Sequence, residues 1–371
     1  MSEYKILTIN PGSTSTKTAI YEGETKLFAA NVAHDANELA KYPGISDQLP
    51  YREETIRALL AESGVSLDGV AAVVGRGGGL LAMEGGVYGM NEIMLDHAVR
   101  GANGIQHPAQ LGPQIAKKFA DEIGCPVFVV NPPDVDELQP LARMTGIKGV
   151  YRNVHLHSLN LKETAIQHSK KIGKKYEDCN YVVCHIGGGT SISAHLKGRM
   201  VDGNVGSGGD GAFTPTRIGS VPVLPLLDYI EAHSIEEVRR MCSRSGGFVS
   251  YFGTSNAKVV HRLVEEKDPK AVLVWNAMIY QCCKQIGAMS AVLEGKVDGI
   301  LLTGGLVRYA DIVEGIQRRC GWIAPITVYP GEMEQEAMAY AVLKVLRGEN
   351  AAIRYSGKPV WEGFPFMDNE A

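Results

Sequence analysis

The chain has 371 residues, of which 45% are hydrophobic and 21% charged, and its formal net charge at pH 7 is −4. This length exceeds one ordinary domain core of roughly 100–200 residues, so we expect two domains, and the composition excludes a disordered protein. The slightly acidic balance argues against a protein that coats nucleic acid or an anionic membrane. The N-terminus has no signal-peptide pattern, no apolar run approaches the ~20 residues of a membrane span, and the seven cysteines form no C-x-x-C pair. We therefore expect a cytoplasmic protein with reduced thiols.

Short apolar segments that predict strands alternate with amphipathic segments that predict helices. The strands are expected at residues 6–9, 70–74, 127–130, 181–186 and 299–303. The helices are expected at residues 52–63, 108–123, 156–172, 235–243, 256–266, 272–293 and 334–346. Such alternation is typical of an α/β fold with mostly parallel sheets.

The sequence also contains a weak internal repeat. Residues 4–14 align without a gap beside residues 181–191, and each copy is an apolar strand, a glycine turn, a hydroxyl cluster and a second strand. Residues 67–70 similarly match residues 297–300, at a larger separation that requires an insertion in the second half. The repeat predicts two like domains with a ligand in the cleft between them, and chance similarity of β-hairpins is the alternative.

The loop after the first expected strand, Asn-Pro-Gly-Ser-Thr-Ser-Thr-Lys at residues 10–17, is rich in hydroxyl groups. It is not a Walker A motif, because Thr16 stands where that motif has its second glycine and because a strand rather than a helix follows. A hairpin can still offer N–H groups and hydroxyls to phosphate oxygens, with Lys17 as a point charge. A polar β-turn without a ligand is the equally weighted alternative.

Two further glycine turns follow expected strands. His185 and Ile186 precede three glycines, Gly187, Gly188 and Gly189, and Thr303 precedes a glycine pair, Gly304 and Gly305. Glycine permits close approach of the backbone to a ligand. One such turn is a weak signal, but three at strand ends in one chain favour a ligand site.

Several charged or titratable residues stand in similar positions. Arg76 and Arg217 have glycine neighbours and suit the bidentate clamping of a carboxylate or phosphoryl group, although a solvated arginine is the usual alternative. His157 begins an expected helix, where a structural and a phosphate-binding role are equally open. Glu334 begins the last expected helix, where it either complements the helix dipole or binds magnesium.

Together these motifs resemble the acetate and butyrate kinase family, within the larger group of actin, sugar-kinase and heat-shock chaperone ATPases. The resemblance spans nearly the whole chain, and its specific parts are residues 9–17, 74–79, 184–189, 213–217 and 302–306. The butyrate kinase branch is suggested by residues 83–88, 136–138, 206–214 and 328–331.

The resemblance implies two duplicated actin-like (ribonuclease H-like) ATPase domains around a central cleft. The N-terminal domain would be residues 1–150, with residues 340–371 packing back on it, and the nucleotide-binding domain would be residues 151–339. The implied activity transfers the γ-phosphoryl of ATP to butyrate, or to a similar short or branched carboxylate, reversibly and with Mg²⁺. A homodimer or higher homo-oligomer is implied as well. The alternative is an ATP-gated binding module without this activity, and a sugar kinase is disfavoured because no aspartate base follows a glycine turn.

The resemblance also assigns roles to individual residues. Asn10 and Glu334 would bind magnesium and phosphate, and Arg76, Arg217 and His157 would contact the carboxylate and the transferring group. The expected phosphate and nucleotide ligands are Asn10, Ser13, Ser15, Lys17, His185, Gly187, Gly188, Gly189, Asn256, Gly304 and Gly305.

Two positions depart from the family's pattern. Asn131 stands near the reaction centre, and Asn256 on the adenine side, where the family usually has aspartate. A carboxylate nucleophile is already ionised and needs no general base, so Asn131 need not abolish turnover. Asp134, three residues on, is a candidate to compensate.

Overall fold

The computed structural model describes residues 3–206 and 208–368, which form two units. The first unit contains the chain up to Asp136 and from Met333 onward, and the second contains Glu137–Glu332. The domain boundaries expected at 150/151 and 339/340 stay a prediction about which parts fold independently. Among the described residues, no helix has the length and apolar character needed to cross a bilayer.

The first unit is built on a seven-stranded sheet in the order β12-β5-β6-β4-β1-β2-β3. Its strands are β1 (Lys5–Pro11), β2 (Ser15–Glu22), β3 (Thr25–Ala33), β4 (Val70–Gly75), β5 (Val87–Gly89), β6 (Val127–Val130) and β12 (Ile353–Arg354). Its helices are α1 (Ala36–Leu39), α2 (Leu49–Ser63), α3 (Glu92–Arg100), α4 (Leu111–Ile123), α13 (Glu334–Leu346) and α14 (Pro365–Asp368), with 3₁₀ turns at Ser46–Gln48 and Pro108–Gln110.

The second unit is built on a five-stranded sheet in the order β11-β10-β7-β8-β9. Its strands are β7 (Asn180–Ile186), β8 (Thr190–Leu196), β9 (Arg199–Gly203), β10 (Gly299–Gly304) and β11 (Ile326–Pro330). Its helices are α5 (Pro140–Arg143), α6 (Ser158–Lys171), α7 (Val223–Ala232), α8 (Ile235–Arg240), α9 (Phe248–Phe252), α10 (Ala257–Glu265), α11 (Pro269–Val292) and α12 (Ala310–Cys320). A π-helical turn at Met241–Ser245 follows α8, and 3₁₀ turns lie at Tyr176–Asp178 and Leu306–Arg308.

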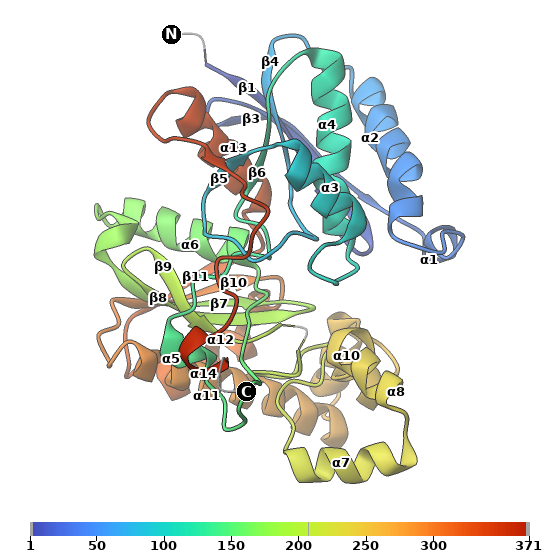
Figure 1. Cartoon of the computed structure of the whole chain (residues 1–371). Helices are drawn as coiled ribbons and strands as arrows, with labels where there is room; N and C mark the ends of the chain where they lie inside the picture. The colour runs from blue at the N-terminus through green and yellow to red at the C-terminus, as the bar shows by residue number, and fades with distance from the viewer. Residues whose placement is uncertain (1–2, 207, 369–371) are drawn as a thin grey trace. The chain divides into compact units, whose positions relative to one another are not determined.

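Each sheet is covered by helices on both faces (Figure 1). In the first unit, apolar side chains of α2 and α4 pack with Leu7 and Ile9 of β1, while α13 covers the other face. In the second unit, α11 and α12 pack with Val182 and Cys184 of β7, while α6 covers the other face. Successive side chains of β1 and β7 therefore point to opposite, helix-covered faces of their sheets, which explains why both strands are buried along almost their whole length.

The two sheets share one topology. In the first sheet, β1, β2 and β3 are antiparallel neighbours, and β4 and β6 lie parallel to β1 on its other side. In the second sheet, β7, β8 and β9 are antiparallel neighbours, and β10 and β11 lie parallel to β7 on its other side. The prediction of a duplicated α/β fold is confirmed. Both sequence echoes fall on equivalent strands, β1 with β7 and β4 with β10.

The gapless alignment of the repeat is wrong at the hairpin. In the first unit the last residue pair is Pro11 with Thr16, whereas in the second it is Ile186 with Thr190. Asn10 therefore still lies in a strand, but Gly187, which the alignment places opposite it, already lies in the turn. We call residues 12–15 the first hairpin loop and residues 187–189 the second hairpin loop.

Candidate functional site

A buried cluster of three polar side chains lies in the first unit at the end of β1. Asn10 Nδ2 donates a hydrogen bond to Glu334 Oε2 at 2.7 Å, and Arg76 Nη1 donates to the same oxygen at 3.1 Å. Arg76 Nη1 also lies 3.4 Å from Asn10 Oδ1. The Glu334 side chain is 4% exposed and that of Arg76 13%, so this ion pair is largely shielded from water. The sequence singled out all three residues, and the structure brings them together.

The backbone around Arg76 explains why it reaches Asn10. Arg76 follows β4, and its N–H donates to the Ile9 carbonyl of the neighbouring strand at 2.8 Å. Helix α4 approaches this point so closely that a Cβ on Gly112 would lie 2.2 Å from the Arg76 carbonyl oxygen. Only glycine fits there, and the close approach fixes the end of β4. Glu334 is the first residue of α13.

The donor set of this cluster fits a magnesium ion that keeps water and phosphate ligands. Glu334 supplies a carboxylate and Asn10 an amide oxygen, and Mg²⁺ typically takes one or two carboxylates and fills its other positions with water or phosphate. A cage made of protein alone is not offered, because no group of three or more His, Cys, Asp or Glu side chains suited to a metal is found among the described residues.

The first hairpin loop places the expected phosphate ligands beside this cluster. The Gly12 N–H donates to the Ser15 carbonyl at 2.7 Å, which closes the turn. Ser13 is exposed, and its hydroxyl lies 3.3 Å from His107 Nε2. Lys17 pairs with Asn10 in the register of β1 and β2. Ser13, Ser15 and Lys17 therefore share one hairpin with Asn10.

Asn131 follows β6 and caps a neighbouring turn. It adopts a positive φ of 38°, its N–H donates to the Gly86 carbonyl at 3.0 Å, and its Oδ1 accepts from the Gly86 N–H at 2.8 Å. Its side-chain oxygen thus serves the backbone. Asp134 is 4% exposed, and burial raises the pKa of its carboxyl to about 7. The Asp134 carboxyl accepts a hydrogen bond from Asn103 Nδ2, in the segment that follows α3.

In the second unit, two histidines stack at the end of β7. The rings of His157 and His185 lie 3.9 Å apart and 9° from parallel. His157 Nδ1 lies 2.8 Å from the Ser191 hydroxyl. His185 Nδ1 accepts from Asn160 Nδ2 at 2.9 Å, which places the ring proton of neutral His185 on Nε2. The Asn160 amide also donates to the Thr303 hydroxyl at 3.2 Å, so β7 and β10 are joined here by side chains.

The second hairpin loop lies against the guanidinium of Arg217. A Cβ on Gly189 would lie 2.6 Å from Arg217 Nη1, and one on Gly206 would lie 3.0 Å from it. Arg217 has no carboxylate within ion-pair distance in the described part of the chain, and its Nε is buried without a hydrogen-bond partner. Burial lowers the pKa of Arg217 from its usual value. A guanidinium without an acidic partner is able to bind an anionic ligand.

Threonine hydroxyls connect the Arg217 turn to this loop. Thr214 Oγ1 and Thr216 Oγ1 both donate to the Gly188 carbonyl, at 2.9 and 3.0 Å. The Arg217 N–H donates to Thr214 Oγ1 at 3.1 Å. The Gly188 carbonyl is therefore directed toward the threonines.

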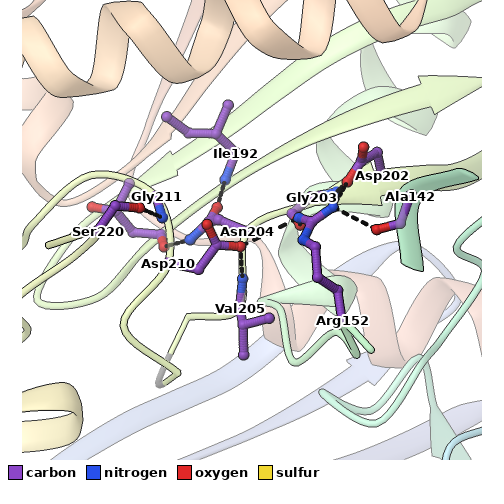
Figure 2. Close-up of polar contacts among 11 residues, drawn as sticks. Ala142, Arg152, Ile192, Asp202, Gly203, Asn204, Val205, Asp210, Gly211 and Ser220 are labelled. Atoms are coloured by element: carbon purple, nitrogen blue, oxygen red, sulfur yellow. Dashed lines mark hydrogen bonds and ion pairs between the residues drawn. The ribbon is translucent and has the colours of Figure 1, made fainter. Parts of the chain in front are cut away.

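A second arginine, Arg152, anchors the segment that leads to Arg217 (Figure 2). Its Nη1 donates to the Ala142 carbonyl at 2.7 Å and to Asp202 Oδ1 at 3.0 Å. Its Nη2 donates to the Gly203 carbonyl at 2.7 Å and lies 3.3 Å from Asp210 Oδ2. This partly buried network joins the end of β9 to Asp210 in the segment that leads to the Arg217 turn.

Asn204 attaches the same segment to β8. Its Oδ1 accepts from the Ile192 N–H at 2.7 Å (Figure 2). Its Nδ2 donates to the Thr190 carbonyl at 3.0 Å. Arg152, Asn204 and Ser191 were not among the site residues expected from the sequence. Their only sequence signal is that Ser191 follows the glycine turn.

The glycine pair after β10 lies beside β7, because Thr303 pairs with His185 in the sheet. Gly304 has a φ of 97° and exchanges two backbone hydrogen bonds with Gly331. Gly305 is exposed, and no atom lies within 4 Å of the place where its Cβ would be. The unit thus gathers His157, His185, Arg217 and both glycine turns. Asn256 is an exposed N-cap of α10 that accepts from the Lys258 N–H at 3.0 Å, and no contact between it and that group is seen in the described residues.

Comparisons with known proteins agree with this picture. Residues 147–319 match the model of the acetokinase family. An acetate kinase from Entamoeba histolytica superposes with a TM-score of 0.72 at 17% identity, covering 92% of this chain and 99% of that one. An acetate kinase from Porphyromonas gingivalis superposes with a TM-score of 0.70 at 17% identity, covering 92% of this chain and 100% of that one. A propionate kinase from Francisella tularensis subsp. tularensis SCHU S4 superposes with a TM-score of 0.69 at 17% identity, covering 91% of this chain and 98% of that one. The chain therefore shares the fold of these kinases.

Proposed function

We propose that the protein is a carboxylate kinase that transfers the γ-phosphoryl of ATP to butyrate, or to a similar short or branched-chain acid, in a reversible reaction. The observation that carries the proposal is the buried cluster of Asn10, Arg76 and Glu334. It offers a guanidinium and a carboxylate at the strand end where the hydroxyl-rich hairpin begins. The acetokinase family match over residues 147–319 supports the same reaction class.

In this proposal the cluster in the first unit serves the transferring group. Arg76 neutralises charge on the carboxylate and on the phosphoryl oxygens, and Ser13, Ser15 and Lys17 hold phosphate. Glu334 and Asn10 would hold Mg²⁺, which supplies charge neutralisation when it is bound. The phosphoryl-transfer transition state is loose, so such a site acts by positioning and charge stabilisation without a covalent intermediate.

The second unit supplies the nucleotide side of the reaction. Gly187–Gly189 and Gly304–Gly305 present backbone to the nucleotide, and Asn256 is proposed to contribute on the adenine side. Arg217, without an acidic partner of its own, neutralises the oxygens of the transferring phosphoryl, and His157 and His185 offer ring N–H groups. Asn131 is compatible with the reaction, because a carboxylate acceptor is ionised at neutral pH and no base has to remove a proton from it.

The reaction class is tested by trapping acyl phosphate with hydroxylamine. The purified protein is incubated with Mg-ATP and each of a panel of C2–C5 carboxylates, and the hydroxamate is quantified. We expect a signal that is largest with butyrate or isobutyrate and that is absent in Arg76→Ala. A blank panel with bound ATP would replace the proposal by the ATP-gated binding module, and a maximum at acetate or propionate would correct the chain length alone.

We further propose that the protein acts as a homodimer or larger homo-oligomer in the cytoplasm, joined through α7. None of the described side chains of this apolar helix is buried, and Val223, Leu224 and Leu227 are 70%, 73% and 53% exposed. A cavity of about 550 Å³ beside it is lined by apolar groups that include Phe213, Tyr251 and Leu273. A helix and a cavity on one unit suit a twofold contact between identical copies.

The oligomer is tested by replacing Leu224 and Leu227 with serine. We expect light scattering to give a smaller assembly for this variant, at unchanged helical content, because apolar area at the contact is lost. The replacement of Leu141, another exposed leucine, by serine is the control. A wild-type monomer, or an unchanged assembly of the variant, would contradict the proposed contact.

A further inference from the structure

Arg52 of α2 is a fully buried arginine without an acidic partner. Its side chain is 0% exposed, and no Asp or Glu side chain of the described residues forms an ion pair with it. Its Nε donates to Gln48 Oε1 at 3.0 Å, and its Nη1 donates to Thr16 Oγ1 at 3.0 Å and lies 3.3 Å from the Ser15 carbonyl. Its Nη2 is buried without a hydrogen-bond partner. The guanidinium therefore lies directly behind the first hairpin loop.

A buried cation without a counter-ion is unfavourable, so this arrangement requires an explanation. Burial lowers the pKa of Arg52 to about 10, which still leaves it charged at neutral pH. Burial, together with the charge of Arg52, lowers the pKa of neighbouring His34 to about 4, so His34 is neutral there. Arg52 thus keeps one positive charge behind the loop, with only dipoles to balance it.

The hydrogen bonds of the loop show a consistent direction. The carbonyl of Thr14 accepts from the His34 N–H at 2.8 Å, and that of Ser15 accepts from Gly12 N–H and from Arg52. The carbonyl groups of Thr14 and Ser15 therefore point toward hydrogen-bond donors inside the protein. The N–H groups of Ser13 and Thr14 have no acceptor among the described residues. Consecutive backbone N–H groups with this freedom form a site for an anion.

We propose that Arg52 is a positioning residue for an anion bound on the first hairpin loop. Arg52 Nη1 holds the loop so that the Ser15 carbonyl points inward. The unbalanced charge of Arg52 strengthens the binding of phosphate oxygens by the N–H groups of the loop. The inference rests on the phosphate role given to this loop in the proposed function. It adds a residue that touches neither the substrate nor the reacting atoms.

The test compares Arg52→Gln, Arg52→Lys and the control Arg57→Gln. Arg57 lies on the same helix but pairs with Glu53 at 2.9 Å and also with Glu122, so its charge is already balanced. Binding of inorganic phosphate and of pyrophosphate is measured by the rise in the unfolding temperature with ligand concentration. Steady-state kinetics give KM for ATP and kcat separately.

We expect Arg52→Gln to weaken phosphate binding and to raise KM for ATP by about tenfold or more, with a smaller change in kcat. Arg52→Lys, which keeps the charge, should recover most of the affinity, and Arg57→Gln should match the wild type. A folded Arg52→Gln protein that binds phosphate like the wild type would overturn the inference, because a merely structural arginine lowers the unfolding temperature without changing the response to phosphate.

If Arg52→Gln does not fold, Thr16→Val takes its place. This variant removes the hydroxyl that accepts from Arg52 Nη1 while the charge remains, and we expect a two- to fivefold loss of phosphate affinity. No loss would overturn the positioning role. The phosphate readout needs no acyl transfer, so Arg52-dependent binding in a protein that forms no acyl phosphate would uphold the inference and refute the proposed function.

Discussion

The two units place different chemistry on the same sheet topology. Each has a hairpin loop after its first strand, and each sets beside that loop an arginine without an acidic partner among the described residues. This arginine is the fully buried Arg52 in the first unit and the half-buried Arg217 in the second. In the first unit the arginine lies behind a hydroxyl-rich loop and binds its carbonyl side. In the second unit the guanidinium lies against Gly189 itself.

The difference teaches what the shared fold decides and what it leaves to individual residues. In both units the topology places a loop at the carboxyl end of the first strand. Ligands in open α/β sheets typically bind at the carboxyl ends of strands. The strand in the first unit continues to Asn10 and so joins Glu334 and Arg76 in a cluster of mixed charge. The second unit has glycines at that point, and its arginine has no carboxylate to compete with an anionic ligand.

Removal of Arg76 is the largest expected disturbance of this arrangement. We expect Arg76→Ala to lower kcat/KM for carboxylate phosphorylation by about 10²–10⁴-fold, because the guanidinium stabilises charge that develops in the transition state. The assay is the hydroxamate trap under initial-rate conditions, with Arg57→Ala as the surface control. A loss below tenfold would remove Arg76 from the transition-state role and would leave it as the partner of Glu334.

A smaller effect separates the second unit from the first. Gly189→Ala places a Cβ 2.6 Å from Arg217 Nη1, so the guanidinium has to move. We expect kcat to fall by about 10–100-fold, as is typical of a displacement of about 1 Å in a catalytic group, with little change in the unfolding temperature.

Two alanine variants serve as comparisons for Gly189→Ala. Gly188→Ala should be milder, since no atom lies within 4 Å of its added Cβ, and Gly146→Ala, equally unobstructed and outside both glycine turns, should be silent. Equal losses at Gly188 and Gly189 would mean that Arg217 plays no part and that the loop backbone alone matters.

The sequence predicted the duplicated α/β fold and most of the members of each cluster. Apolar strands that end in Gly, Asn or Arg have a local signature, so β1, β4, β7 and β10 were expected close to their observed bounds. The proximity of Arg76 to Glu334 could not be read from spacing, because the two residues are separated by most of the chain. It followed from a resemblance to a known family.

Other residues gave no usable signal or a misleading one. Arg52 stands beside Glu53 and Glu54 in an amphipathic segment and looks like a solvated residue, yet it is completely buried. Asn256 was expected with the nucleotide ligands. Its side chain caps α10 at the surface, and its place on the adenine side stays a prediction. The exposed apolar helix α7 was not expected at all, because its hydrophobic run, which contains Pro225, resembles a core segment. Burial depends on which elements pack together, and this packing is difficult to predict from a single sequence.

The smallest expected effect concerns His34, which lies behind the first hairpin loop. Its Nε2 lies 2.8 Å from the Thr16 hydroxyl and its Nδ1 3.0 Å from the Tyr51 hydroxyl, and Arg52 is the charged group that faces it. With a native pKa of about 4, against about 6.5 in the unfolded chain, the unfolded state binds more protons between these values. The free energy of unfolding therefore rises with pH across that window and is lost as the pH falls through it.

His34→Gln should flatten this dependence, because glutamine can still bond to Thr16 but does not titrate. We expect urea unfolding to show that the wild type loses about 1–3 kcal/mol more than the variant between pH 6.5 and pH 4. Tyr51→Phe removes a hydrogen bond of the same ring but keeps the titrating group, so its curve should run parallel to that of the wild type. Parallel curves for His34→Gln and the wild type would mean that His34 binds its proton as readily in the native state as in the unfolded chain. Arg52 would then not be the sole charge behind the loop below about pH 6.5, and the contrast between the two hairpins would rest at acidic pH on the second unit alone.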